Sequence, residues 1–269
     1  MNDTQSYVHG YDLTEASRLA DQASALQPLL HADVAYPPGC RVLEAGCGTG
    51  AQTVSLARNS PGAEIVSVDR SPQSLAAART RIAAAGVTNV RFLEADIMDL
   101  PLADASFDHV FLCFVLEHLA NPAEALRRLR RLLRPGGTLT VIEGDHGSTF
   151  FHPEDEAARD AIAALVALQR ASGGDANIGR RLYPLLRETG FGDVRTIPLL
   201  VYVDGSMPDR AEGFTRRTFA AMIDGAGPAA VTAGLIDRDR HAAGVRALHR
   251  AAEPDGIFSY TFFKAVAKG

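Results

Sequence analysis

Five short apolar runs, each separated from the next by a helical segment, occupy about residues 40–145 and constrain the fold more than any other feature. The runs are RVLEAG, AEIVSVD, VRFLEAD, FDHVFLCF and TLTVIE. Strands that are apolar along their whole length are typical of a parallel sheet, because helices then cover both of its faces. The alternation therefore predicts an α/β fold with a doubly wound, mostly parallel sheet.

The helical segments between these runs carry their own start and stop signals. In SPQSLAAARTRIAAAG, Ser71 is the expected N-cap, Pro72 lies in the first turn and Gly86 ends the helix. Asn121 is the expected N-cap of NPAEALRRLRRLLRPGG. Apolar residues at helical spacing also predict an N-terminal helix from Thr14 to about His31.

After the fifth run the rhythm of the sequence changes. PEDEAARDAIAALVALQRAS and GRRLYPLLRETGF read as helices, DVRTIPLLVYV as a strand, and GIFSYTFFKAVAKG as a last strand. A helical insertion at about 204–254 separates those two strands. We expect a single domain over residues 1–269, with an N-terminal lid and helix (1–38), a core (39–145) and a substrate-pocket region (146–269).

Composition narrows the class of protein and its partners. The formal net charge is −5, and the absence of a long Lys/Arg run argues against a broad nucleic-acid-binding face. No apolar stretch is long enough to cross a bilayer, and the N-terminus does not resemble a signal peptide. The three cysteines, Cys40, Cys47 and Cys113, have no CxxC spacing, which favours reduced thiols and a cytoplasmic location. The sequence does not indicate an oligomeric state.

The stretch VLEAGCGTG, residues 42–50, runs from a strand through three alternate glycines into a helix. Gly46, Gly48 and Gly50 allow backbone conformations and close approaches that other residues resist. Free N–H groups at the start of the following helix can bind an anionic group. The pattern alone is also found at ordinary tight turns.

Three carboxylates strengthen the indication of a ligand site. Glu44 precedes the glycines, Asp69 ends the second strand and Asp96 ends the third. At these positions Asp69 can accept both hydroxyls of a ribose, and Asp96 can accept from the amino group of an adenine. Each carboxylate alone would read as a turn or cap residue. All three at matched strand ends, with the glycine loop, indicate a nucleoside site.

These segments resemble the class I S-adenosylmethionine-dependent methyltransferases, in their small-molecule branch. The matching motifs are VLEAGCGTG, VSVDRS, EADIMDLP, FDHVFLCFVLEHL and LRPGGTLTVIE, in order over about residues 39–145. The resemblance implies a seven-stranded sheet in the order 3-2-1-4-5-7-6 with the last strand antiparallel. It also implies an N-terminal helical lid.

The resemblance implies S-adenosyl-L-methionine as cofactor and S-adenosyl-L-homocysteine as its product. The glycines would approach the methionine moiety, and Glu44 would lie near its amino group. Cys113 and Phe114 would lie beside the sulfonium. The candidate cofactor-binding residues are Tyr11, Glu44, Gly46, Cys47, Gly48, Gly50, Gln52, Asp69, Arg70, Asp96, Ile97, Cys113 and Phe114.

A nicotinamide dinucleotide is the alternative ligand for this loop. It usually requires GxGxxG, whereas this sequence has GxGxG followed by AQT. Asp96 would also have no clear role there. The nicotinamide reading therefore ranks second.

The polar stretch EGDHGSTFFHPED, residues 143–155, is expected to leave the fifth strand as a loop and to form a wall of the acceptor pocket. His146 suits proton transfer near neutral pH, and His118 is a second catalytic candidate, although both histidines also suit structural roles. No metal is expected, because neither HxH nor HExxH spacing occurs. Residues 153–156 resemble a first helical turn.

The acceptor is expected to be a small organic molecule. Arginine suits recognition of a carboxylate, which favours O-methylation of a carboxylic acid to a methyl ester. N- or C-methylation of a small quinone-type metabolite is the alternative, because VLEHLANPAEALRRLRRLLRPGGTL is similar to quinone-biosynthesis C-methyltransferases. A non-catalytic module that binds the cofactor is a third possibility. The candidate substrate-binding residues are Tyr7, Asp145, His146, Arg180, Tyr183, Tyr202 and Arg217.

Overall fold

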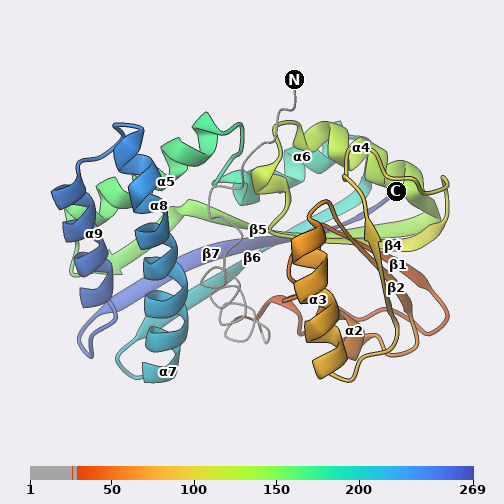
Figure 1. Ribbon diagram of the computed structural model, residues 1–269, viewed down its shortest axis with the longest axis horizontal. Coiled ribbons are helices and arrows are strands. Elements are labelled where there is room, and N and C mark those ends of the chain that lie inside the picture. Colours follow the sequence, from red (N-terminus) through yellow and green to blue (C-terminus); the bar gives the residue numbers. More distant parts are fainter. Residues whose placement is uncertain (1–25, 27–28) are drawn as a thin grey trace. The chain divides into compact units, whose positions relative to one another are not determined.

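The computed structural model describes residue 26 and residues 29–269 (Figure 1). Seven strands in these residues form one sheet in the order β3-β2-β1-β4-β5-β7-β6, which confirms the predicted order. The strands are β1 (Arg41–Ala45), β2 (Glu64–Asp69), β3 (Val90–Glu94), β4 (Phe107–Cys113), β5 (Leu133–His152), β6 (Gly192–Asp204) and β7 (Ile257–Lys268). Most of the predicted N-terminal helix and lid, with Tyr7 and Tyr11, lies outside the described residues.

Helical segments follow most strands. They are α2 (Thr53–Asn59), α3 (Pro72–Ala84), η1 (Leu116–His118), α4 (Pro122–Leu132), α5 (Glu156–Ala171), η2 (Ile178–Arg181), α6 (Leu182–Glu188), α7 (Pro208–Arg210), the π-helical η3 (Ala211–Ala220), α8 (Ala221–Thr232) and α9 (Arg238–Arg250). Two predicted caps are confirmed. The Ser71 hydroxyl accepts from Ser74 N at 3.1 Å, and Asn121 Oδ1 accepts from Glu124 N at 3.1 Å.

The described chain divides into two compact units built from interleaved segments. The first, called here the glycine-loop unit, comprises 29–143, 178–199 and 263–269. The second, called the aromatic unit, comprises residue 26, 144–177 and 200–262. The expectation of a single domain with a lid stays a prediction.

In the glycine-loop unit, β1 pairs in parallel with both β2 and β4, and β4 pairs in parallel with β5. Adjacent residues of β1, Val42 and Leu43, are both fully buried. A strand with one wet face would alternate, so helices cover both faces here, as the apolar runs predict. Helices α4 and α6 pack over one face, where Leu129 and Leu186 join Leu43 in the core (Figure 1).

The aromatic unit contains α5, α8 and α9, which pack on one another (Figure 1). The predicted helical insertion is present as the segments α7 to α9 between β6 and β7. Five aromatic side chains, none more than 3% exposed, fill the interior with ring centroids 4.7–6.1 Å apart: Phe214, Phe219, Phe258, Tyr260 and Phe262.

The expectation that the strand ends before EGDHGSTFFHPED is wrong, because β5 continues to His152. Backbone N–H groups of this polar stretch find acceptors about 30 residues later in the aromatic unit. Ala176 O accepts the backbone N–H of His146 at 3.1 Å, and Asn177 Oδ1 accepts that of Gly147 at 2.8 Å. The helix begins three residues later than predicted: α5 starts at Glu156, and Asp155 is its N-cap, whose Oδ1 accepts from the backbone N–H of Ala157 at 2.7 Å.

Candidate functional site

The glycine loop follows β1 and has left-handed backbone at all three glycines, with φ of +78°, +52° and +76° at Gly46, Gly48 and Gly50. A Cβ at Gly46 would lie 2.7 Å from Val115 Cγ2, and one at Gly50 would lie 3.0 Å from Ala78 Cα. Both glycines are therefore required by packing. A Cβ at Gly48 would meet nothing within 4 Å, so only this glycine borders space open to a ligand.

Glu44 lies at the start of this loop with only 2% of its surface exposed. Its Oε2 accepts from the Ser67 hydroxyl at 2.6 Å. Burial raises the pKa of Glu44 to about 7, although the hydrogen bond from Ser67 acts in the opposite direction. Near neutral pH this carboxyl is therefore poised between its two forms, and a nearby cation would favour the ionised one.

Asp69 connects β2 to the loop. Its Oδ2 accepts from Gly48 N at 2.8 Å, and its Oδ1 accepts from Ser71 N at 2.9 Å. Each carboxylate oxygen keeps a further lone pair that can accept from a hydroxyl. At the end of β3, Asp96 Oδ1 accepts from Met98 N at 2.8 Å, next to the nearly buried Ile97.

The end of β4 carries the next group of predicted residues. Cys113 is 9% exposed, and burial raises the pKa of its thiol well above the ordinary range. Phe114 has a φ of +59°, which turns the chain sharply into η1. His118 Nε2 lies 3.5 Å from Glu117 Oε1 in η1. These contacts leave the proposed catalytic role of His118 a prediction.

Glu143 of β5 contacts the residues that follow β4, although the sequence did not single it out. Its carboxyl is fully buried, and Oε1 accepts from the backbone N–H groups of Val115 at 3.0 Å and Leu116 at 2.7 Å. The available signal was its position at the end of the apolar run TLTVIE. That is the same signal that identified Asp69.

The predicted site residues are divided between the two units. The glycine-loop unit holds Glu44, Gly46, Cys47, Gly48, Gly50, Gln52, Asp69, Arg70, Asp96, Ile97, Cys113, Phe114, His118, Arg180 and Tyr183. The aromatic unit holds Asp145, His146, Tyr202 and Arg217. Gln52 Oε1 lies 2.6 Å from His31 Nε2, a contact that the sequence did not indicate.

His146 is 5% exposed inside the aromatic unit. Its Nδ1 lies 3.0 Å from the carbonyl oxygen of Ala176 and 3.1 Å from the hydroxyl of Tyr260. The ring of Tyr260 meets the imidazole edge-on, with centroids 5.6 Å apart. Tyr260 is therefore a second polar residue at this histidine that sequence reasoning did not select.

The residues predicted to bind an acceptor carboxylate lie mostly at the surface. Arg217 Nε lies 3.5 Å from Glu212 Oε1, and the arginine side chain is 56% exposed. Tyr183 and Tyr202 are 52% and 38% exposed, and Arg180 is also exposed. Asp145 differs, because only 2% of its surface is accessible.

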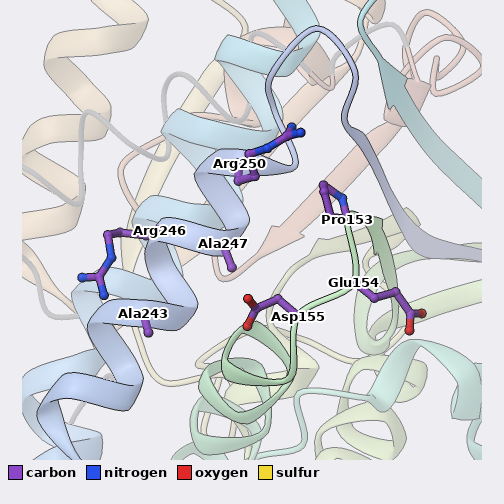
Figure 2. Close-up of a pocket in the computed structure, with 7 residues that line it drawn as sticks. All are labelled: Pro153, Glu154, Asp155, Ala243, Arg246, Ala247 and Arg250. Atoms are coloured by element: carbon purple, nitrogen blue, oxygen red, sulfur yellow. The ribbon is translucent and has the colours of Figure 1, made fainter.

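A surface cleft of about 350 Å³ lies between the start of α5 and α9 (Figure 2). Its lining residues are Pro153, Glu154, Asp155, Ala243, Arg246, Ala247 and Arg250. Arg250 makes two 2.7 Å contacts with Asp255, and Glu154 Oε1 accepts from Arg159 at 2.6 Å. None of the predicted site residues lines this cleft, so we do not assign it to the acceptor.

Within residues 26 and 29–269, no group of three or more His, Cys, Asp or Glu side chains is arranged to hold a metal ion. In the same residues no helix has the length and apolar character needed to cross a membrane.

Comparison with known proteins identifies a family. The model of a family described as a methyltransferase domain matches residues 43–141. An uncharacterised 37.1 kDa protein from a transposon of Streptomyces fradiae is 33% identical over 238 residues, which cover 87% of this chain and 66% of the relative. The demethylmenaquinone methyltransferase of Thermus thermophilus is 44% identical over 103 residues, which cover 38% of this chain and 46% of that enzyme. The matches thus span about half to two thirds of these relatives.

Solved structures agree on the fold. The phosphoethanolamine N-methyltransferase 2 of Haemonchus contortus, in complex with phosphomonomethylethanolamine and S-adenosylhomocysteine, superimposes with a TM-score of 0.59 at 18% identity. The superposition covers 99% of this chain and 59% of that one.

Proposed function

We propose that this chain, a member of the class I S-adenosylmethionine-dependent methyltransferases, transfers a methyl group to a carbon atom of a small quinone-type metabolite. The observation that carries the methyl-donor part is the glycine loop with Gly48 open to ligand and Asp69 tied to it. The acceptor part is supported by the 44% identity to a demethylmenaquinone methyltransferase.

The residues at the strand ends fit the cofactor. Glu44 is a buried carboxyl whose pKa of about 7 allows it to ionise beside a cationic amino group. Asp69 retains acceptor capacity for ribose hydroxyls, and Asp96 and Ile97 follow β3, where an adenine is bound in this fold. Gly48 leaves room for the methionine moiety. The bound cofactor supplies an electrophilic methyl group on a sulfonium.

The finer choice of acceptor is also part of the proposal. The carboxylic-acid reading depended on arginines, but the candidate Arg217 contacts a carboxylate of the chain itself, Glu212, at 3.5 Å. An apolar ring requires no such cation. Methylation at a ring carbon of a quinol requires loss of a hydroxyl proton, because the oxyanion makes the ring carbon nucleophilic. After the methyl group is bound, the ring carbon releases its own hydrogen as a proton, the ring regains its aromaticity and the oxygen is protonated again. The role of His146 as the base for the hydroxyl proton stays a prediction, because its Nδ1 lies 3.0 Å from the carbonyl oxygen of Ala176.

The test is a turnover assay with a panel of acceptors. Purified chain is incubated with S-adenosyl-L-methionine and a short-chain demethylmenaquinol, simple phenols, carboxylic acids or amines, and release of S-adenosyl-L-homocysteine is measured by mass spectrometry. We expect turnover with the quinol, and we expect NMR of the product to show the new methyl group on a ring carbon. Asp69→Ala is the control, because it should lose both binding and turnover.

The other outcomes distinguish the alternatives. Turnover with carboxylic acids alone would favour methyl-ester formation, and turnover with amines alone would favour N-methylation. Binding of S-adenosyl-L-homocysteine in calorimetry without turnover of any acceptor would favour a non-catalytic binding module. Absence of binding would contradict the proposed function as a whole.

A further inference from the structure

The turn between β4 and η1 begins where the hydrogen bonds between β4 and β5 end. Phe114 N donates to Ile142 O at 2.9 Å, which continues the β4–β5 pairing by one residue. The next two N–H groups, of Val115 and Leu116, open η1 and have no strand carbonyl opposite them. Buried N–H groups of this kind must find an acceptor elsewhere.

Glu143 supplies that acceptor from the neighbouring strand. The N-cap residue of η1 is Val115, whose side chain cannot accept a hydrogen bond. Glu143 Oε1 instead accepts from both Val115 N and Leu116 N, at 3.0 and 2.7 Å. Glu143 and Leu116 are both fully buried, so no solvent competes for the bond between them.

The same turn packs on the glycine loop. Val115 Cγ2 lies 2.7 Å from where a Cβ of residue 46 would be, so the Val115 side chain occupies the space left by Gly46. Phe114 precedes Val115 with a φ of +59°. The two bonds to Glu143, together with the bond from Phe114 N to Ile142 O, therefore hold this strained turn beside the loop.

We propose that Glu143 is a positioning residue for methyl transfer, which holds residues 114–116 against the glycine loop. The inference rests on the proposed function, because the resemblance to the methyltransferase family implies that Cys113 and Phe114 lie beside the sulfonium of its cofactor. Alignment of acceptor, methyl and sulfur governs the rate of such a transfer, so displacement of this turn lowers kcat. Glu143 acts through the turn and not by contact with the substrate.

The chemistry of the Glu143 side chain indicates which substitution preserves its bonds to Val115 and Leu116. Burial, followed by the nearby Glu117, raises the pKa of Glu143 well above its ordinary range. Both bonds from the turn go to a single oxygen of this carboxyl, Oε1. Glutamine offers a carbonyl oxygen at the same reach, whereas leucine offers none.

The experiment compares Glu143→Gln and Glu143→Leu with a matched control. Thr140→Val removes a polar group that is also buried in β5, where Thr140 accepts from the Tyr36 hydroxyl at 3.3 Å, away from the turn. Turnover of short-chain demethylmenaquinol and binding of S-adenosyl-L-homocysteine are measured below the melting temperature of each variant. We expect kcat of E143L to fall at least about 30-fold, because a displaced turn would misalign the acceptor, the methyl group and the sulfur, and the rate depends strongly on that alignment. E143Q and T140V should stay within about threefold of wild type.

Backbone hydrogen exchange provides a readout that does not need turnover. E143L should accelerate exchange at Val115 and Leu116, and E143Q should leave both amides protected. Unchanged protection in E143L, or a kcat of E143L equal to that of T140V, would overturn the proposal. Equal inactivity of E143Q and E143L with protected amides would also overturn it, because the carboxyl would then act chemically. Failure of the wild-type chain to bind S-adenosyl-L-homocysteine would instead overturn the proposed function. The exchange result would still show whether Glu143 holds the turn.

Discussion

The burial of Glu44 is expected to couple cofactor binding to pH. Burial raises its pKa to about 7, and the amino group of the bound cofactor would favour the ionised carboxylate. Binding should therefore release a proton, and the affinity for S-adenosyl-L-homocysteine should rise by about tenfold between about pH 6 and 8. Calorimetry in buffers of different ionisation enthalpy measures both quantities. Glu44→Gln should abolish the pH dependence, and a pH-independent affinity of the wild-type chain would contradict this coupling.

The same carboxyl makes a prediction for stability. Between its ordinary value of 4.5 and its folded-state pKa of about 7, Glu44 holds a proton in the folded chain that it has lost in the unfolded chain. The free energy of unfolding therefore decreases as pH rises through this window, by on the order of 3 kcal/mol. Urea unfolding at about pH 5 and 8 should show a larger decrease for the wild-type chain than for Glu44→Gln. An equal decrease in the free energy of unfolding for both chains would mean that a group other than Glu44 causes it.

The glycine loop allows binding and folding to be separated by single substitutions. Gly48→Ala introduces a Cβ that meets nothing within 4 Å, so it should cost only about 1 kcal/mol for the left-handed backbone. The new methyl group enters the space assigned to the cofactor, and affinity should fall at least about tenfold. Gly46→Ala is the matched comparison, because its Cβ would lie 2.7 Å from Val115 Cγ2 and should impair folding itself. An unchanged affinity in Gly48→Ala would remove Gly48 from the site.

Among the secondary-structure elements, those with local signals were predictable. The apolar runs gave the strands of the core, and Ser71 and Asn121 gave the helix starts, because a cap acts within three residues. The length of β5 was not predictable, because the partners of His146 and Gly147 lie about 30 residues later in the chain. A polar segment of a strand looks like a loop in the sequence when the partners of its hydrogen bonds lie far away in the chain.

The candidate site shows the same division. Glu44 was identified because it precedes the glycines, and Asp69 and Asp96 because each ends a predicted strand. Glu143 ends a predicted strand as well, but its partners are backbone groups 27 and 28 residues earlier, for which no side-chain pattern exists. Tyr260 meets His146 from a strand 114 residues away. Contacts of this separation depend on the sheet order and not on local composition.

Strand β7 carries a buried cation whose partner is exposed. Lys264 has 3% of its side chain exposed and pairs with Asp33, whose side chain is 66% exposed. Asp33→Ala leaves a buried ammonium group without its carboxylate, whereas Lys264→Met leaves only a solvated carboxylate. We expect Asp33→Ala to cost several kcal/mol of unfolding free energy in urea and Lys264→Met to cost less than about 1 kcal/mol. The opposite order would mean that the methylenes of Lys264 contribute more than its charge.

For the whole molecule, three strands run through the segments of both units, so we expect the described chain to unfold in one cooperative transition. The predicted cofactor residues Glu44, Asp69 and Asp96 all belong to the glycine-loop unit. S-Adenosyl-L-homocysteine at 100 times its Kd stabilises by about 2.7 kcal/mol, because it binds only the folded state. For a chain of this size that should raise Tm by about 5–10 °C in scanning calorimetry.

The control for this shift is a nicotinamide dinucleotide at the same concentration. It should leave Tm unchanged, because the loop has GxGxG and not the GxGxxG that such a ligand requires. Two separate transitions, of which only one responds to S-adenosyl-L-homocysteine, would show that the units unfold independently and that the cofactor stabilises one of them. A shift with the dinucleotide and none with S-adenosyl-L-homocysteine would contradict the ligand assignment, since stabilisation follows the ligand that the folded loop binds.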